Sequence, residues 1–303
     1  MPIPLCSRSH GKEKLGGNPD TSKGSFYFNP LVDYPGSEID RAQYPASYPC
    51  NLWPSEAILP GFQDAAKDIG KLMFHIVILL ARHIDHFVYS TSSSYPPNTL
   101  HNILSDTQKV KGRLLYYYPL KKDNEYLEDL GEDSWIGWHN DSGFLTALAG
   151  EIYVNDTTGK ILEDCPDPQA GLYVSNRMGE TCKVCIPYDC MAVQLGECIQ
   201  ILTGGVLAAT PHCVRGVTTA AYSGSIARIS LPCFIDSVPT FKLVSPSSRE
   251  IVLNSGVKND KVPHLSERWT ENGMTFGDFL QKSFEMYYNW SLSSVVENGK
   301  SLN

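Results

Sequence analysis

The clearest pattern in the first third of the chain is helical. Between Phe62 and Phe87, apolar residues recur at steps of three and four, as in "IGKLMFHIVILLARHI" over 69–84. This spacing places apolar side chains on one face and predicts a long amphipathic helix. The segment "SSSYPPN" over 92–98 ends the pattern, and a short helix near 99–109 is expected to follow.

The pattern changes after Lys111. Short runs rich in β-branched and aromatic residues alternate there with Gly, Pro, Asn and Asp, which favours strands of a sandwich or barrel over alternating βαβ units. Residues 275–290 return to helical spacing and predict a C-terminal helix outside the β core. The predicted strands are "GRLLYYYP", "SWIGWH", "FLTALAG", "GLYVSN", "TCKVCIP", "CMAVQL", "CIQIL", "HCVRGV" and "SIARISLPCF".

The first 60 residues have a different character, because they are rich in Gly, Pro, Asn, Ser and Tyr. Such a composition predicts turns and extended segments, so we expect an arm on the surface of a domain. The predicted organisation is an N-terminal arm and helical flank over 1–110 and a β domain with a C-terminal helix over 111–303. Together they are expected to form one structural unit.

Composition narrows the class of protein. Hydrophobic residues make up 42% of the chain and charged residues 19%, which is too apolar for a disordered protein. The net charge of −8 and the lack of a Lys/Arg cluster argue against a nucleic-acid or anionic membrane partner. The apolar run 74–81 is short for a membrane span, and no secretory signal is evident.

Nine cysteines without a regular framework favour reduced thiols and a cytoplasmic location. The sequence does not indicate an oligomeric state.

The segment "WHNDSG" over 138–143 is the first candidate for chemistry. His139 and Asp141 would lie on the same face near the end of a strand, with Asn140 facing away. His212, in "ATPHCVRG", could supply a third ligand from a later strand. Two histidines and one carboxylate on one side of a metal form the facial triad of non-haem Fe(II) oxygenases. On this evidence alone, a turn at Asp141 and a hydrogen-bonded core histidine remain open alternatives.

A second pair lies in "SIARISLPCF". Arg228 and Ser230 share one face of a strand, and the opposite face carries Ile229 and Leu231. An arginine in a barrel interior is costly unless it is paired, and binding the far carboxylate of a dianion would remove that cost. An arginine at the rim that pairs with an acidic residue is the alternative.

From "NLWP" at residue 51 to the C-terminal helix, the chain resembles the 2-oxoglutarate/Fe(II)-dependent oxygenases of the isopenicillin N synthase-like type. The similarity rests on the order H-x-D, distant His and R-x-S, together with "GLYVSN" and "VQLGECIQILTGGVLAATPHCVRG". The resemblance implies a double-stranded β-helix, or jelly-roll, core. It also implies an enzyme that uses O₂ to oxidise a small organic substrate, most often by hydroxylation, with release of succinate and CO₂.

The resemblance also implies roles for individual residues. His139, Asp141 and His212 correspond to the Fe(II) ligands, Arg228 and Ser230 to the anchor for the C5 carboxylate of 2-oxoglutarate, and Tyr118 to a further hydroxyl for that co-substrate. Three features depart from the family. Tyr116 stands where Asn is common, the interval from Asp141 to His212 is longer than usual, and the usual N-terminal α/β portion is missing. We expect the excess near 151–169 to form an inserted hairpin or loop at the rim. The missing portion leads us to expect a truncated or alternatively spliced form.

Two functional alternatives remain open. An Fe(II) oxidase of the same fold could use O₂ without 2-oxoglutarate and still keep Arg228 and Ser230. A catalytically silent binding or regulatory protein could retain the fold. Cys182 and Cys185 have a C-x-x-C spacing, but residues i and i+3 of a strand face opposite sides, which argues against a zinc site.

Overall fold

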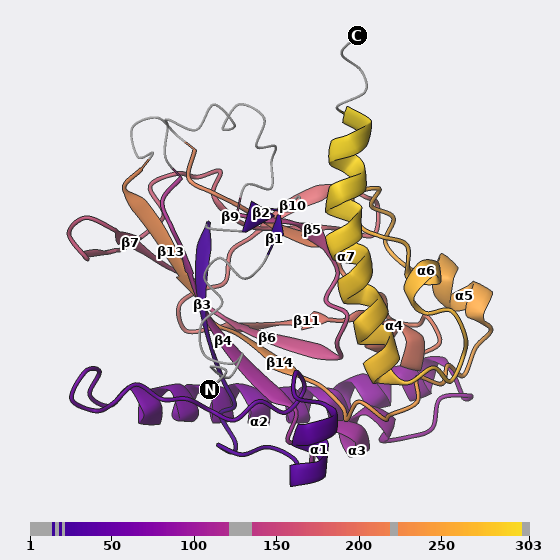
Figure 1. The fold of residues 1–303 in the computed structure, drawn as a ribbon. Coiled ribbons are helices and arrows are strands. Elements are labelled where there is room, and N and C mark those ends of the chain that lie inside the picture. The colour runs from indigo at the N-terminus through magenta and orange to yellow at the C-terminus, as the bar shows by residue number, and fades with distance from the viewer. Residues whose placement is uncertain (1–13, 16–17, 20–21, 121–134, 219–223, 299–303) are drawn as a thin grey trace.

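Two antiparallel sheets, one above the other in Figure 1, form the centre of the molecule, and helices flank them. The structure is a computed structural model that describes residues 14–15, 18–19, 22–120, 135–218 and 224–298. The architecture is mainly β with flanking helices, as the alternation of short apolar runs and turn residues predicts.

The main sheet contains most of the strands. β13 (Ile226–Ser230) and β14 (Pro232–Ile235) follow one another along one side of β4 (Val110–Tyr117). The rest of the sheet comprises β11 (Met191–Leu195), β6 (Leu145–Ala149), β7 (Ile152–Asn155) and β8 (Ile161–Leu162).

The smaller sheet has the order β10 (Thr181–Val184), β9 (Gly171–Ser175), β12 (His212–Arg215) and β5 (Ile136–His139). A further pair, β1 (Lys14–Leu15) and β2 (Asn18–Pro19), forms a separate two-stranded sheet.

The predicted long helix is confirmed as α2 (Phe62–Thr91), which contacts β6 and β14 of the main sheet. Its inner face buries Met73, Val77, Ala81 and Val88. By length and composition, α2 is the one helix in the described part of the chain that could cross a membrane, and 39% of its most apolar window is buried inside the protein.

The buried carboxylate of Asp85 links α2 to the next helix, α3 (Thr99–Leu104). It accepts hydrogen bonds from the backbone N–H groups of Leu100 and His101, both at 2.8 Å, and from the hydroxyl of Tyr95 at 2.5 Å. The first N–H groups of a helix lack partners inside the helix, so this carboxylate satisfies them. α3 is shorter than the predicted segment 99–109.

The N-terminal arm is more than a surface segment, because it supplies β3 (Lys23–Phe28) to the main sheet. β3 pairs along the free side of β4, from Lys23 opposite Tyr117 to Phe28 opposite Gly112. The Phe28 ring lies where a side chain at 112 would stand, since a Cβ there would be 2.5 Å from Cζ of Phe28. After β3, the short α1 (Glu38–Gln43) begins at Ser37, which closes a capping box with Asp40.

One predicted strand is wrong. Residues 198–202 lie in a helix, α4 (Glu197–Leu202), in which all six side chains are buried. A short apolar run has no period that separates a buried strand from a buried helix, and the β-branched isoleucines favoured the strand. The predicted extra hairpin over 151–169 is present as β7 and β8, but β7 also pairs with β13 within the main sheet.

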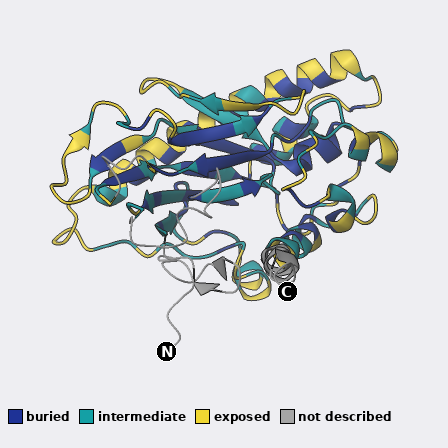
Figure 2. Ribbon diagram, turned by 90° about the horizontal axis from the view of Figure 1, so that it is seen from above, coloured by how far each residue is buried: buried dark blue, intermediate teal, exposed yellow. Residues whose placement is uncertain are grey.

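Three helices complete the fold: α5 (Arg249–Asn254), α6 (Leu265–Arg268) and the predicted C-terminal helix, α7 (Phe276–Asn298). α7 runs along one side of the molecule, with α4, α5 and α6 near its first turns (Figure 1). Buried residues concentrate in the strands, while exposed residues line the outer turns of the helices (Figure 2). The main core lies between α2, the main sheet and the start of α7, where Phe276 and Phe279 are buried.

Candidate metal centre and co-substrate pocket

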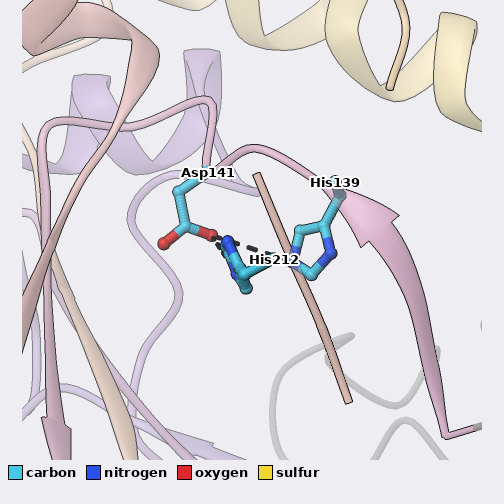
Figure 3. Close-up of side chains that lie close together, drawn as sticks. All are labelled: His139, Asp141 and His212. Atoms are coloured by element: carbon cyan, nitrogen blue, oxygen red, sulfur yellow. Dashed lines mark ion pairs between the residues drawn. The ribbon is translucent and has the colours of Figure 1, made fainter. Parts of the chain in front are cut away.

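His139, Asp141 and His212 converge on one point (Figure 3). His139 ends β5, Asp141 follows two residues later, and His212 begins β12, where it stands opposite His139 in the strand pairing. The Nε2 atoms of His139 and His212 lie 4.0 and 3.9 Å from Oδ1 of Asp141. In the part of the chain that the structure describes, no other group of three His, Cys, Asp or Glu residues comes this close together.

The hydrogen bonds around the triad leave its inward atoms free to bind a cation. Nδ1 of His139 lies 2.8 Å from the carbonyl oxygen of Gly137, and Nδ1 of His212 lies 3.0 Å from that of Thr210. Because a carbonyl can only accept, each Nδ1 carries the proton and each Nε2 presents a lone pair.

Two further features keep the triad in its ligand form. Thr146 donates to Oδ2 of Asp141 at 2.6 Å, which orients the carboxylate and leaves Oδ1 toward the histidines. Burial, reinforced by the nearby imidazole of His212, lowers the pKa of His139 to about 4, so the ring is neutral at neutral pH. Two imidazoles and one carboxylate on one side of a site fit Fe(II) with its remaining positions open.

A cavity of about 80 Å³ extends from the triad between the two sheets. Arg228 and Ser230 line it from β13, as predicted from their shared face. Arg228 is 5% exposed, donates through Nε to Oε2 of Glu151 at 2.6 Å, and lies 4.9 Å from the ring centre of Tyr117. Its Nη1 atom is buried and has no hydrogen-bond partner. An arginine that lines the same cavity as the triad therefore carries a charged N–H group without a partner.

The structure does not bring Tyr118 to this cavity. Tyr118 is 36% exposed, and its hydroxyl lies on the side of Gly24, 3.0 Å from where a Cβ of that residue would stand. Alternate side chains of a strand face opposite sides, and Arg113, Leu115 and Tyr117 are the residues of β4 that face the cavity. Tyr117, which stands opposite Arg228 in the sheet, is thus the tyrosine beside the predicted carboxylate anchor.

The loop that carries Asp141 rests on a buried ion pair. Arg268 donates to both carboxylate oxygens of Glu197, and both side chains are almost fully buried. Asn140 faces away from the triad, as predicted, and donates to Oε1 of Glu197 at 3.1 Å. The Asn140 backbone N–H donates to the hydroxyl of Tyr287, from α7, at 3.1 Å, and the N–H of Glu197 donates to the carbonyl of Asp141 at 2.8 Å. α4, α6 and α7 thereby fix the backbone on either side of the carboxylate.

Two glycines allow close contacts around this loop: Gly196 lets the start of α4 approach it, and Gly143 lets it approach Asp236, which follows β14. A Cβ at Gly196 would stand 2.1 Å from the carbonyl oxygen of Gly143, and a Cβ at Gly143 would stand 2.3 Å from Oδ1 of Asp236. Either contact is far shorter than real Cβ atoms show, and the first is against backbone. A side chain at 196 would therefore push the metal-site loop and α4 apart.

A larger cleft, of about 1250 Å³, opens on the other side of the triad. His139 and Asp141 line both spaces, and so does Arg113. Trp138 lines the cleft as well, but it is only 7% exposed, because most of its ring packs with Tyr173 and other buried residues. The cleft gives an external molecule a route to the metal centre.

Comparison with solved structures identifies the architecture. A Caulobacter crescentus protein described as a 2OG-Fe(II) oxygenase family member aligns with a TM-score of 0.55 and 21% identity, over 87% of this chain and 69% of that one. A full-length Neurospora crassa protein, solved with α-ketoglutarate and thymine, aligns with a TM-score of 0.56 and 17% identity, over 88% of this chain and 66% of that one. The chain has the fold of the 2OG-Fe(II) oxygenases. The jelly-roll prediction is confirmed.

Comparison of the sequence with curated proteins finds relatives of the same kind as these solved structures. A 2-oxoglutarate-dependent dioxygenase from Gibberella zeae is 27% identical over 236 residues, and one from Dothideomycetidae sp. is 26% identical over 225 residues. The aligned regions span 74% and 70% of this chain but 56% and 51% of the relatives. The chain thus spans about half the length of these curated relatives. The resemblance found in the sequence is confirmed, although no family model matches the chain.

The sequence did not point to several residues of the site. Tyr117, Glu151, Thr146 and Gln194 line the cavity. Gln194 lines the cavity from β11, and its Nε2 atom is buried without a partner, like Nη1 of Arg228. Tyr117 could be identified as the inward tyrosine only from the pairing of β4 with β13, in which it stands opposite Arg228. That pairing is not visible in the sequence.

Proposed function

We propose that this chain is a non-haem Fe(II)- and 2-oxoglutarate-dependent dioxygenase that oxidises a small organic substrate. The observation that carries the proposal is the unpartnered Nη1 of Arg228 in the cavity that also holds His139, Asp141 and His212. A buried cationic donor without a partner is costly, and a bound carboxylate would satisfy it with a charge-assisted hydrogen bond. Structural pairing with Glu151 explains only the Nε side of the guanidinium.

The residues divide into two groups in this proposal. His139, Asp141 and His212 would hold Fe(II), while Arg228 and Ser230 would bind the C5 carboxylate of 2-oxoglutarate. When bound, the iron and 2-oxoglutarate supply the oxidising chemistry with O₂, and succinate and CO₂ are released. The two sheets enclose the cavity and limit the access of water to the reacting atoms.

The substrate would approach through the larger cleft, because His139 and Asp141 line both spaces. A small organic molecule is supported by the solved relatives, which include the Neurospora crassa protein with thymine and JOX2 with 2OG, Fe and JA. JOX2 aligns with a TM-score of 0.50 and 17% identity, over 95% of this chain and 68% of that one. We propose hydroxylation as the outcome, on the resemblance to the family alone.

Anaerobic absorption spectroscopy tests the assignment before any substrate is known. The purified chain is loaded with Fe(II) and then titrated with 2-oxoglutarate. We expect a metal-to-ligand charge-transfer band in the visible region that saturates with 2-oxoglutarate. Substrates can then be screened by succinate release.

Two variants separate the parts of the proposal. His212→Ala should lose the band because iron is no longer held, while Arg228→Met should need more 2-oxoglutarate to reach the same band. Folded, iron-loaded protein without a band would overturn the 2-oxoglutarate assignment and favour the oxidase alternative, which O₂ consumption without 2-oxoglutarate would then identify. Failure of the folded chain to hold iron would favour the catalytically silent alternative.

A further inference from the structure

The outer face of α2 carries an apolar stripe that the core does not use. Ile69, Leu72, Ile76 and Leu79 are between 37% and 58% exposed, although the helix buries its opposite residues under the main sheet. Isolated exposed apolar residues are normal on a soluble protein, but a contiguous row is typical of an interaction surface. In Figure 1, α2 crosses the lower part of the molecule, with the main sheet above it.

The spacing of the stripe matches a coiled-coil seam. The four residues recur at steps of three, four and three, which are the a and d positions of a heptad, with Ile69 and Ile76 at a and Leu72 and Leu79 at d. At 30 residues, α2 is long enough to present all four positions without interruption.

The charged residues beside the stripe favour one relative orientation of two paired helices. Asp68 and Arg82, both exposed, occupy the g positions at the two ends, with His75 between them. When two copies of a helix lie antiparallel, the g position of one faces the g position of the other. In a parallel pair the g position faces an e position instead, and the e positions here are Met73 and Leu80, which offer no opposite charge.

One antiparallel register satisfies both patterns at once. If Leu72 packs against Ile76 of the second copy, then Ile69 packs against Leu79, and the symmetry produces four apolar layers. The same register places Asp68 opposite Arg82 of the second copy on both sides of the two-fold axis. This agreement between apolar and charged positions is expected for a self-complementary, isologous interface.

We propose that the outer face of α2 binds the same face of a second copy of this chain in an antiparallel, two-fold dimer. Four layers flanked by exposed ion pairs form a small interface, so the dimer dissociates on dilution. No residue of α2 lines the cleft or the cavity beside the metal centre, so dimerisation leaves both open.

Sedimentation velocity over a concentration series tests the dimer directly. The native chain should shift from monomer at low concentration to dimer at high concentration. Leu72→Glu places two charges in the seam and should weaken dimerisation by roughly 100-fold or more. Ile251→Glu, at an equally exposed apolar residue on α5, is the matched control and should leave the equilibrium unchanged.

Charge reversal tests the antiparallel register. Asp68→Arg and Arg82→Asp should each weaken the dimer by about fivefold, because an attractive pair becomes repulsive on both sides of the axis. The double variant should restore the native equilibrium, since each reversed charge again meets its opposite. Circular dichroism and the Fe(II)/2-oxoglutarate band should be native in all these variants, so failure of this proposal is distinct from failure of the proposed function.

Three outcomes would overturn the dimer. The native chain could be monomeric throughout the series, the dimer could survive Leu72→Glu, or the double charge reversal could fail to recover what the single variants lose. A monomer that floats with phosphatidylcholine vesicles, and loses that property in Leu72→Glu, would assign the stripe to a lipid surface instead.

Discussion

Arg228 and Arg268 are both buried arginines paired with a glutamate, yet their surroundings differ. Arg268 is 0% exposed and uses both Nη atoms on Glu197, with Nη2 also donating to the carbonyl of Pro263. Arg228 holds Glu151 through Nε alone and keeps Nη1 without a partner beside a cavity. Nε of Arg268 is unpartnered too, but Arg268 lines neither the cavity nor the cleft.

The difference shows how a structural ion pair and a binding site can be told apart. A buried pair whose geometry uses both carboxylate oxygens is complete, and its value lies in fixing the elements that it joins. A pair that engages one edge of the guanidinium orients the group and leaves charge available for a ligand. Burial alone therefore does not identify a functional arginine; a spare donor on an arginine that also lines a cavity is the better guide.

The largest effect on stability is expected from Arg268→Met. This change keeps much of the side-chain volume but leaves the buried Glu197 carboxylate without its charged partner. Removing one partner of a buried pair costs about 3–5 kcal/mol of stability, since the other charge stays buried without compensation. Chemical denaturation of the iron-free chain measures this loss. The double variant Arg268→Met/Glu197→Gln should recover part of it, and equal loss in both would show that packing, not charge, dominates at this site.

Arg228→Met should act mainly on ligand binding. A hydrogen bond to a charged group contributes about 1.5–3 kcal/mol, so 2-oxoglutarate should bind roughly 10- to 150-fold more weakly by anaerobic calorimetry. The stability loss should be smaller than for Arg268→Met, because the Glu151 side chain is 21% exposed and can be hydrated. Iron affinity should be native. If 2-oxoglutarate binds normally, the spare donor has no role in binding.

Tyr117, the last residue of β4, and Tyr118, which follows it, provide a matched pair of neighbours on opposite sides of the chain. Tyr117→Leu removes the ring beneath the Arg228 guanidinium, a cation–π contact worth about 1–2 kcal/mol when desolvated, and should weaken 2-oxoglutarate binding by roughly 5- to 30-fold. Tyr118→Leu should change that affinity by less than about twofold. The reverse order of effects would restore the assignment made from the sequence.

The smallest effect is expected from Tyr287→Phe. The hydroxyl that joins α7 to the backbone of Asn140 is lost, and one such hydrogen bond contributes about 0.5–1.5 kcal/mol. Thermal unfolding should report that cost, and iron affinity should fall by a few-fold as the loop before Asp141 loosens. Native iron affinity with reduced stability would mean that the loop is already fixed by Glu197.

Much of the site could be predicted because its signals are local. His139 and Asp141 share a face through a two-residue spacing, and Arg228 and Ser230 do the same, so strand geometry alone relates each pair. The identity of the inward tyrosine in "YYYP" depends on which residue of β4 stands opposite Arg228. Three consecutive tyrosines give no alternation to settle that question, and the assignment to Tyr118 was one residue away from the inward position.

The remaining features depend on contacts between distant segments. Nothing near Glu151 or Glu197 in the sequence indicates which arginine each carboxylate meets. The helix over Glu197–Leu202 was missed for a related reason, since its side chains are buried on every side and show no amphipathic period. The strand that the N-terminal arm adds to β4 was also missed, because its partner lies more than 80 residues along the chain.

His139 lies on β5, a strand that is expected to unfold locally before the rest of the protein. β5 is the last strand of its sheet and is held there by β12 alone among the described strands, with an irregular register between His212 and Val214. Such edge segments open locally before the rest of a protein unfolds. A metal ion held by both histidines would join the edge strand to its neighbour at the point where they end. Amide hydrogens along β5 should therefore exchange quickly in the metal-free protein and become protected when the metal binds. The ion would then stabilise the edge of the smaller sheet as well as form the metal centre.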